Sequence, residues 1–407
     1  MKIAIIGGGA AGFFAAINCA AINTKHSVLL FEKSNKVLAK VRISGGGRCN
    51  VTHSCFDNAR LIEFYPRGKK ELRNAFSRFN TVDTVNWFES CGVKLKTEAD
   101  GRMFPVTDNS ETIIHCLMDE AEKYKVDIKM GYALESILKN EKGKFKLQFQ
   151  NGEEKICDRV IITSGGSPNS NSYDWIAALG HTIISPVPSL FTFNIPASPL
   201  KGLEGISSPS VTVKFEGSKL ESTGPVLITH WGLSGPAVLR LSAFAARWLH
   251  EQNYSAVCYL NWFPEMNEED VRQELFNLKE CHPNKKMSGI TFHGLPSRLW
   301  QRLCLLSGID DDDTCIEINK TKVNKLVQNC CRMSLQIKGK TTFKEEFVTC
   351  GGVSLKDVNM QTMESLKVNG LYFAGEVLDI DGVTGGFNFQ SAWTTGFLAG
   401  VNAAGIK

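Results

Sequence analysis

Three glycines near the start of the chain have the spacing of a phosphate-binding turn. Gly7, Gly9 and Gly12 form a G-x-G-x-x-G pattern that follows the strand-like residues 2–6 and opens a helix-compatible run to Ala21. The first glycine of such a turn allows the sharp bend, the second lets the backbone approach a pyrophosphate, and the third permits close helix-strand packing. The N-terminus of the helix then attracts the phosphate charge.

A secretory signal peptide is the competing interpretation, because it also combines a basic start, an apolar run and small residues. The residues of the next strand decide between the signal peptide and the nucleotide-binding turn. Residues 26–31 have the pattern of a short buried strand, and Glu32 follows at its end, where a carboxylate accepts hydrogen bonds from ribose hydroxyls. We therefore predict a dinucleotide site, in preference to a signal peptide or a glycine-rich turn of an ordinary α/β protein.

The end of the chain returns to this pattern of strand, glycine and acid. Residues 370–376 read as a strand that ends at Gly-Glu, and residues 384–388 open a final helix of small residues. This return predicts a discontinuous nucleotide domain, which resembles the way the glutathione-reductase-like class holds FAD. In that class the acid hydrogen-bonds the ribityl chain and the helix N-terminus points at the flavin pyrimidine. Glu376 stands where aspartate is more usual, so Asp379 or Asp381 could share its role.

Another glycine run lies beside cations. Residues 44–48 (SGGGR) combine flexible backbone with a guanidinium, which suits them to wrap a pyrophosphate and a flavin edge, with Lys40 as a second cation. The alternative is a solvated loop. For Cys49 we expect packing or a backbone contact to FAD in preference to redox chemistry, since Cys55 is the only other cysteine close in sequence.

His230 is the acid/base candidate among the eight histidines, because it follows a buried-strand pattern and precedes a rigid turn. A structural role is the alternative. The turn residues 232–235 lack the G-x-S-x-G spacing of a hydrolase nucleophile. The thirteen cysteines form no C-x-x-C or Cys/His pattern, and Asp310–Asp313 read as a solvated loop. We therefore predict no metal and reduced cysteines.

The elements that must position these residues indicate an α/β protein. Strand and helix patterns alternate to about residue 190, as in a doubly wound sheet, with a helix from Ser110 to Tyr124 and a hairpin around Asn151-Gly152. Short strands follow, and then helical patterns. The expected domains are a discontinuous FAD-binding Rossmann domain of the glutathione-reductase-like type (1–190 and 347–407), an inserted small β-barrel (191–264 and 331–346) and a helical insert (265–330).

Four motifs together resemble one family. They are KVRISGGGRCNVT (40–52), GRMFP (101–105), THWGLSGP (229–236), and AGEVLD (374–379) with GGFN (385–388). They are similar to the HI0933-like bacterial flavoproteins, which include aminoacetone oxidases and bile-acid reductases of the BaiN type. The resemblance covers essentially the full chain and implies the three-domain layout above.

We accordingly expect an FAD-dependent oxidoreductase that transfers hydride at flavin N5, with NAD(P)H-linked reduction of a small organic or steroid-like substrate. Only one dinucleotide fingerprint occurs, so NAD(P)H would bind transiently. Two alternatives stay open: an amine oxidase of the aminoacetone type that uses oxygen, and an FAD-containing protein that binds or modifies RNA.

The net charge of the chain indicates which kinds of binding partner to expect. The formal net charge is +4 and the Lys and Arg residues are scattered, which makes nucleic acid an unexpected partner. We expect a cytoplasmic protein without membrane spans, and its oligomeric state stays open, with a monomer compatible. The residues predicted to bind FAD are Gly7, Gly9, Ala11, Gly12, Glu32, Lys33, Lys40, Ser44, Gly45, Gly46, Arg48, Cys49, Asn50, Ala133, Gly165, Gly375, Glu376, Asp379, Gly385, Gly386, Phe387 and Asn388.

Overall fold

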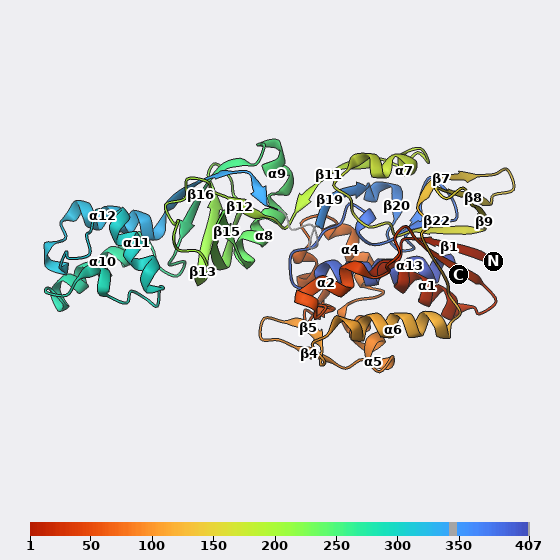
Figure 1. Cartoon of the computed structure of the whole chain (residues 1–407), viewed down its shortest axis with the longest axis horizontal. Coiled ribbons are helices and arrows are strands. Elements are labelled where there is room, and N and C mark those ends of the chain that lie inside the picture. Colours follow the sequence, from red (N-terminus) through yellow and green to blue (C-terminus); the bar gives the residue numbers. More distant parts are fainter. Residues whose placement is uncertain (342–347, 406–407) are drawn as a thin grey trace. The chain divides into compact units, whose positions relative to one another are not determined.

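The computed structural model describes residues 1–341 and 348–405, which divide into two compact units (Figure 1). The first unit is Met1–Ser189 with Lys344–Lys407, and the second is Leu190–Phe343. The predicted FAD-binding domain spans nearly the same residues as the first unit. The predicted barrel and helical domains both belong to the second.

A seven-stranded sheet forms the centre of the first unit, in the order β20-β21-β22-β10-β1-β2-β6. Buried apolar runs such as Ile3–Ile6 favour parallel pairing, in which helices cover both faces of a sheet. Because β22 pairs with β10 in parallel, the two ends of the chain build one sheet, as the sequence predicts. The parallel strands are β1 (Lys2–Ile6), β2 (Ser27–Glu32), β6 (Asp127–Met130), β10 (Arg159–Ile162) and β22 (Leu371–Phe373), and the antiparallel edge is β20 (Val358–Asn359) and β21 (Glu364–Ser365).

Two helices from opposite ends of the chain pack closely beside this sheet: α1 (Ala10–Ile22) and α13 (Phe387–Ala403). Small residues permit the contact. A Cβ added at Gly396 would lie 2.7 Å from the carbonyl oxygen of Ala11, and one added at Gly400 would lie 2.3 Å from that of Ala15. The N-termini of α1 and α13 are therefore fixed relative to each other.

Smaller elements surround this centre. They include three small sheets, ordered β3-β5-β4, β7-β8-β9 and β11-β19. The structure confirms the predicted helix after residue 110 and the hairpin around Asn151-Gly152, which is β8-β9. The elements are α2 (Ala39–Gly47), β3 (Thr52–His53), α3 (Asn58–Leu61), α4 (Lys69–Phe76), α5 (Thr81–Ser90), β4 (Leu95–Thr97), β5 (Arg102–Pro105), α6 (Ser110–Lys123), β7 (Leu134–Lys139), β8 (Phe145–Phe149), β9 (Glu154–Cys157), α7 (Asp174–Ala177), β11 (Ile183–Ser189) and β19 (Val348–Val353).

The second unit is built on an antiparallel seven-stranded sheet in the order β17-β16-β13-β14-β15-β12-β18. Its strands alternate buried and exposed residues, as strands with one face on a core do. The strands are β12 (Thr192–Asn194), β13 (Ser207–Phe215), β14 (Glu221–Thr229), β15 (Gly232–Ser234), β16 (Ser255–Asn261), β17 (Met333–Lys338) and β18 (Lys340–Thr341), and the helices are α8 (Pro236–Phe244), α9 (Ala246–Glu251), α10 (Glu268–Cys281), α11 (Ser297–Leu306) and α12 (Lys320–Cys331).

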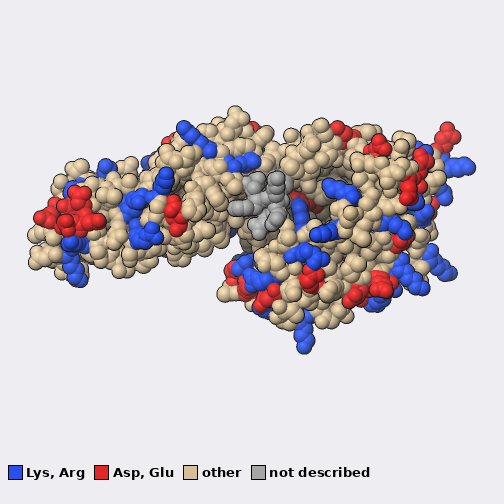
Figure 2. All heavy atoms as spheres, viewed as in Figure 1, with Lys and Arg blue, Asp and Glu red and all other residues tan. Residues whose placement is uncertain are grey.

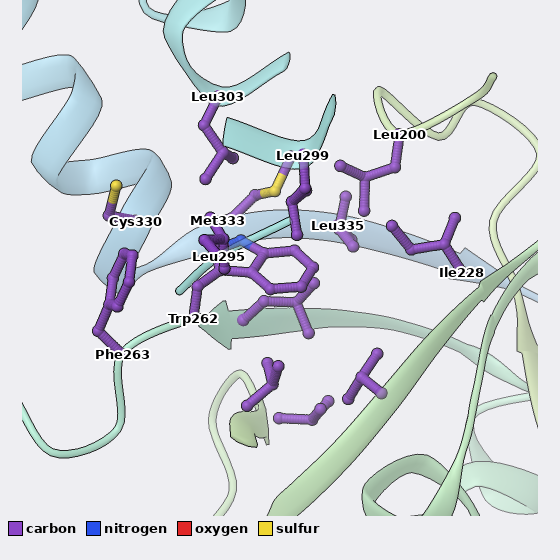
Figure 3. Packing of buried hydrophobic residues seen from close by; sticks show 14 of the residues in the cluster. Leu200, Ile228, Trp262, Phe263, Leu295, Leu299, Leu303, Cys330, Met333 and Leu335 are labelled. Carbon is purple, nitrogen blue, oxygen red and sulfur yellow. The ribbon is translucent and has the colours of Figure 1, made fainter. Parts of the chain in front are cut away.

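One hydrophobic core joins the sheet and helices of the second unit. Figure 3 shows Trp262, just after β16, among Leu295 and Leu299 from the helical segment and Leu335 from β17. All four side chains are at most 5% exposed, so the sheet and the helices are stabilised together. No helix among residues 1–341 and 348–405 is long and apolar enough to cross a membrane.

Candidate flavin-binding site

The site lies where parallel strands of the first unit end. β1, β2, β10 and β22 run in the same direction, so their carboxyl ends meet at one edge of the sheet. This edge brings together segments that the sequence analysis selected separately: the glycine turn after β1, Glu32 at the end of β2, Gly165 after β10, and Gly375-Glu376 after β22. Open α/β sheets bind ligands at this edge.

The turn after β1 has the geometry expected of its glycines. Gly7 has φ +119°, which disfavours other residues, and a Cβ there would lie 2.3 Å from the carbonyl oxygen of Thr163. A Cβ at Gly12 would lie 1.9 Å from the carbonyl oxygen of Gly7, so only glycine allows this packing. At Gly9, in contrast, no described atom lies within 4 Å of an added Cβ. The side of the turn at Gly9 is therefore open to a ligand.

Glu32 is held beside this turn. Its carboxylate accepts hydrogen bonds from the N–H groups of Gly8 (2.8 Å) and Ser34 (2.9 Å). The Tyr132 N–H donates to the Glu32 carbonyl at 2.9 Å, which brings the predicted residue Ala133 near the end of β2. Lys33 is exposed next to Glu32. The backbone therefore orients the carboxylate that the sequence analysis assigns to a ribose.

The loop within α2 is irregular. Ser44, Gly45 and Gly46 have non-helical backbone angles, and both glycines have positive φ. A Cβ at Gly46 would meet no described atom within 4 Å, which leaves this backbone accessible to a ligand. The Ser44 hydroxyl donates to the carbonyl of Val41 at 3.0 Å and stabilises the kink.

Arg48 is engaged within the protein. Its Nη1 donates to Glu98 at 2.6 Å and lies 3.6 Å from Asp108, and its guanidinium carbon lies 4.0 Å from the centre of the Phe104 ring. The carboxylate of Glu98 raises the pKa of Arg48 through a hydrogen bond. Binding of FAD by Arg48 stays a prediction, because these contacts already use part of its guanidinium.

Cys49 and Asn50 are both buried. Burial raises the pKa of the Cys49 thiol to about 12, which keeps it protonated and unreactive. With its amide oriented to satisfy its neighbours, Asn50 accepts a hydrogen bond from the Gly386 N–H at 2.9 Å and donates to the carbonyls of Thr52 (2.9 Å) and Met103 (3.2 Å). Asn50 thus fixes the start of α13 to the segment around β3.

Glu376 is anchored from two directions. Lys40 Nζ lies 2.6 Å from its Oε2, and the Thr349 N–H donates to its Oε1 at 2.9 Å. A Cβ at Gly166 would lie 2.7 Å from Oε1, so the glycine makes room for the carboxylate. Lys40 therefore joins the loop at α2 to the acid after β22. Figure 2 shows Lys and Arg side chains around a hollow on this face of the first unit, an arrangement that attracts anions.

The first residues of α13 complete the edge. Asn388 bonds to both the N–H and the carbonyl of Gly382, each at 2.9 Å. The Phe387 ring stacks on Phe64 with centroids 4.2 Å apart and on His53 at 4.8 Å. Among the residues predicted here, Gly385 offers a backbone N–H group, whereas the N–H of Gly386 donates to Asn50 and the side chains of Phe387 and Asn388 pack within the protein. Asp379 is half-buried after Gly375-Glu376.

Two polar atoms near this edge were missed by the sequence analysis. Thr349 Oγ1 and His53 Nδ1 are buried and have no hydrogen-bond partner among the described residues. Thr349 lies beside Glu376, and His53 Nε2 lies 3.1 Å from the carbonyl of Asp100. Burial lowers the pKa of His53, so its imidazole is neutral near pH 7. No local pattern marks either residue, because each acquires its place through distant contacts.

The N-termini of the helices indicate whether these residues could bind FAD. In α5, α6, α10 and α12 an asparagine side chain caps the first turn. Like α4, α8 and α11, the helices α1 and α13 have no capping side chain, and their N-cap residues are Gly9 and Gly386. Their first N–H groups and positive dipole ends suit a diphosphate and an electron-rich flavin pyrimidine. With the open glycine turn and the unpartnered Thr349 hydroxyl, the site fits FAD.

His230 lies in the second unit, exposed in the turn between β14 and β15. Its proposed catalytic role stays a prediction, since the other site residues belong to the first unit. Within residues 1–341 and 348–405, no group of three His, Cys, Asp or Glu side chains could hold a metal ion.

Comparisons with known proteins agree with this geometry. A 3-dehydro-bile acid delta(4,6)-reductase of Clostridium scindens is 30% identical over 99% of both chains. A ribosomal RNA dihydrouridine synthase of Escherichia coli is 31% identical over 99% of this chain and 98% of its own. The structure of a 3-ketosteroid-delta4-(5alpha)-dehydrogenase from Rhodococcus jostii superposes with a TM-score of 0.53 and 14% identity, covering 100% of this chain and 97% of the other. The model of the HI0933-like protein Rossmann domain matches residues 1–402, and the chain therefore belongs to this family of FAD-dependent oxidoreductases.

Proposed function

We propose that the enzyme reduces a carbon-carbon double bond conjugated to a carbonyl group, in a small organic substrate of steroid type. The observation that carries this proposal is the open glycine turn before α1, with Glu32 and Glu376 held at the same edge of the sheet. This arrangement suits FAD, and FAD supplies a hydride from N5 when bound and reduced.

The names of two relatives support the choice of reaction. A delta(4,6)-reductase acting on a 3-dehydro bile acid reduces a dienone, and dihydrouridine is uridine with its C5–C6 double bond reduced. In both reactants a carbonyl polarises the double bond, so the β carbon accepts a hydride and the α carbon accepts a proton. One arrangement of flavin and proton donor serves both reductions.

The residues of the chain have distinct roles in this proposal. The N–H groups at Gly9 and Ala11 would bind the diphosphate, and the Glu32 carboxylate would accept hydrogen bonds from the adenosine ribose. Glu376, held by Lys40 and Thr349, would bind the ribityl chain. The positive end of α13 would stabilise negative charge on the flavin pyrimidine, which favours the reduced cofactor.

The proton must come from a side chain or from water. We propose His230 for this role, as the sequence analysis does, and His53 as the alternative, because its Nδ1 is unpartnered beside the start of α13. An imidazole that donates a proton gives an activity that falls as pH rises through its pKa. The pH profiles of His230→Gln and His53→Gln would show which variant loses that limb.

The first test is an anaerobic visible spectrum of the purified holoprotein before and after NADH or NADPH is added. Bleaching of the flavin bands, followed by reoxidation with a 3-oxo-4,6-diene bile acid and a product two hydrogens heavier, is the expected result. Flavin that stays oxidised with both nicotinamides but is bleached by aminoacetone, with peroxide formed in air, would replace this proposal by the amine oxidase.

A second candidate substrate is uridine in ribosomal RNA, and the Escherichia coli relative favours it. The charge distribution speaks against extensive RNA contact by the helical segment: residues 265–330 contain more acidic than basic residues, and Figure 2 shows Asp and Glu side chains gathered over it. Mass spectrometry of rRNA from a deletion strain tests this candidate. Loss of a dihydrouridine that only active enzyme restores would establish it.

A cytoplasmic location remains part of the proposal, and the oligomeric state stays open. Sedimentation of the holoprotein at several concentrations and fractionation of cells would test them. A mass near 44.9 kDa at every concentration would indicate a monomer.

A further inference from the structure

A buried ion pair joins two segments of the first unit that are far apart in the sequence. Arg67 lies between α3 and α4, and Asp381 lies between β22 and α13. Arg67 Nε donates to Oδ1 of Asp381 and Arg67 Nη2 donates to Oδ2, so two hydrogen bonds join the guanidinium to the carboxylate. The side chains are 10% and 0% exposed. The pair therefore belongs to the interior of the protein.

Ser189, at the end of β11, is a third member of this group. Its hydroxyl donates to Oδ2 of Asp381 at 2.7 Å, and Arg67 Nη2 lies 3.3 Å from the same hydroxyl oxygen. Burial raises the pKa of Asp381, and the charge of Arg67 opposes that rise. Since both carboxylate oxygens accept hydrogen bonds, the group satisfies a charge that would be costly to bury alone.

The segment that carries Arg67 contacts the first turn of α13. The Phe64 ring stacks on that of Phe387, with centroids 4.2 Å apart and planes inclined by 10°. The Tyr65 hydroxyl donates to the carbonyl of Phe387 at 2.6 Å. Because Phe387 is the first residue of α13, the residues just before Arg67 fix the N-terminus of this helix.

The segment that carries Asp381 leads into the same turn of α13. The next residue, Gly382, exchanges two hydrogen bonds with the Asn388 side chain. The N–H of Val383 donates to the carbonyl of Phe64 at 2.9 Å. The ion pair thus joins the two segments that hold the N-terminus of α13.

Charges at this place would act on a bound flavin. The proposed function sets the N-terminus of α13 against the flavin pyrimidine, which becomes more negative when the flavin is reduced. Buried charges are screened less than exposed ones, so their effect extends further. In the native pair the two opposite charges compensate each other. The loss of one charge would leave the other to act alone.

We propose that Arg67 and Asp381 are positioning residues that hold the start of α13 and balance the charge beside it, and thereby set the reduction potential of the bound flavin. This inference rests on the proposed function, because it requires FAD at this end of α13. Asp381→Asn keeps the shape of the side chain and leaves the guanidinium, which cannot lose its proton. The uncompensated positive charge should favour the reduced flavin.

Spectroscopic titration of the FAD-loaded full chain against a dye of known potential tests this. We expect Asp381→Asn to favour reduced over oxidised flavin about tenfold or more, a rise of about 30 mV for a two-electron couple. The double variant Arg67→Gln with Asp381→Asn lacks both charges and should return to the native potential. An unchanged or lower potential in Asp381→Asn, or an equal rise in the double variant, would overturn the proposal.

Arg159→Gln is the matched control, because it changes a charge at the other end of the same helix. Arg159 Nη1 donates to the carbonyls of Asn402 (3.1 Å) and Ala403 (2.7 Å). Since α13 has 17 residues, this end lies about 25 Å from Phe387. We expect the native potential in Arg159→Gln. A rise like that of Asp381→Asn would show that the potential does not report the charge near the N-terminus of α13, and would contradict the proposal.

Ser189→Ala is the milder variant if Asp381→Asn does not fold, because it deletes a single oxygen. The carboxylate loses a hydrogen-bond donor and its negative charge is less compensated, so the potential should fall. An unchanged potential in this variant would overturn the proposal. A native chain that binds no FAD would overturn the proposed function as well, whereas a native holoprotein whose variants fail these expectations would overturn this inference alone.

Discussion

Lys40 Nζ lies 2.6 Å from Glu376 Oε2, although the two residues are 336 positions apart in the sequence. The pair connects α2 with the segment after β22, and thus the two predicted halves of a cofactor site. The side chains are 51% and 20% exposed, so solvent screens the attraction and its contribution to folding is small. Its importance is therefore expected in cofactor binding.

We predict that Glu376→Gln weakens FAD binding about tenfold or more, because a charged hydrogen-bond acceptor is lost, while the midpoint of urea unfolding changes little. Fluorescence quenching of FAD measures the affinity. Glu63→Gln is a matched control, since Glu63 pairs with Lys69 on the surface of the same unit. Equal affinities for the two variants would remove Glu376 from the cofactor site.

Local sequence patterns predicted the elements of this site well. The spacing of Gly7 and Gly12 predicted positions where a side chain would clash with the backbone, and the structure shows those clashes. The apolar strands before Glu32 and Gly375 were predicted to belong to one parallel sheet, and both pair in parallel. These features could be predicted because each depends on residues close in sequence or on a regular pattern.

Side-chain partners could not be predicted in the same way. Arg48 was assigned to the cofactor, yet its guanidinium bonds to Glu98, and Asn50 is used to fix Gly386. The isolated hydroxyl of Thr349 arises only when distant segments fold together. Nothing in the local sequence marks which of several polar residues will meet across such a distance.

We predict that Asn50→Asp destabilises the protein more than Asn50→Ala does. The alanine variant loses all three contacts of the amide, at a cost of about 1 to 3 kcal/mol for buried groups left unpaired. The aspartate variant keeps an acceptor for the Gly386 N–H. The carboxylate also places an acceptor against the carbonyl oxygens of Thr52 and Met103, which accept from the native amide. Urea unfolding at pH 7.5 measures both. An aspartate variant as stable as the native chain would contradict this assignment of the amide.

We predict that the folded protein loses stability in mild acid because His181 is buried. It is 4% exposed, and burial lowers its pKa below the usual 6.5. The unfolded chain therefore binds a proton near pH 6.5 that the folded chain does not bind until lower pH. Stability is fully present above about pH 6.5 and decreases as the pH falls toward the folded-state pKa.

Unfolding free energies at pH 7.5 and 5.5 measure this effect, to which the lowered pKa values of His26 and His53 also contribute. We expect His181→Gln, which can still bond to Ser365, to reduce the difference between the two unfolding free energies. His115→Gln is the control because that side chain is 73% exposed. An unchanged difference in His181→Gln would show that His181 is protonated in the folded state.

We predict that alanine substitutions at Gly9 and Gly12 have different effects: the change at Gly12 lowers stability, and the change at Gly9 mainly weakens cofactor binding. A Cβ at Gly12 would lie 1.9 Å from the Gly7 carbonyl oxygen, so Gly12→Ala must displace backbone and should cost about 1 to 3 kcal/mol or more of stability without cofactor. At Gly9 an added Cβ meets no described atom within 4 Å, and φ of −90° suits alanine. Gly9→Ala should therefore cost less than about 1 kcal/mol as an N-cap change.

The same substitution at Gly9 should weaken FAD binding at least tenfold, because the methyl group occupies the space through which the diphosphate approaches the helix N-terminus. Urea unfolding of the FAD-free proteins and titration with FAD measure the two effects separately. Gly289→Ala, which also meets nothing within 4 Å, controls for adding a methyl group elsewhere. If Gly9→Ala binds FAD as the native chain does, the diphosphate does not lie against this turn, because no protein atom there could compensate for the lost space.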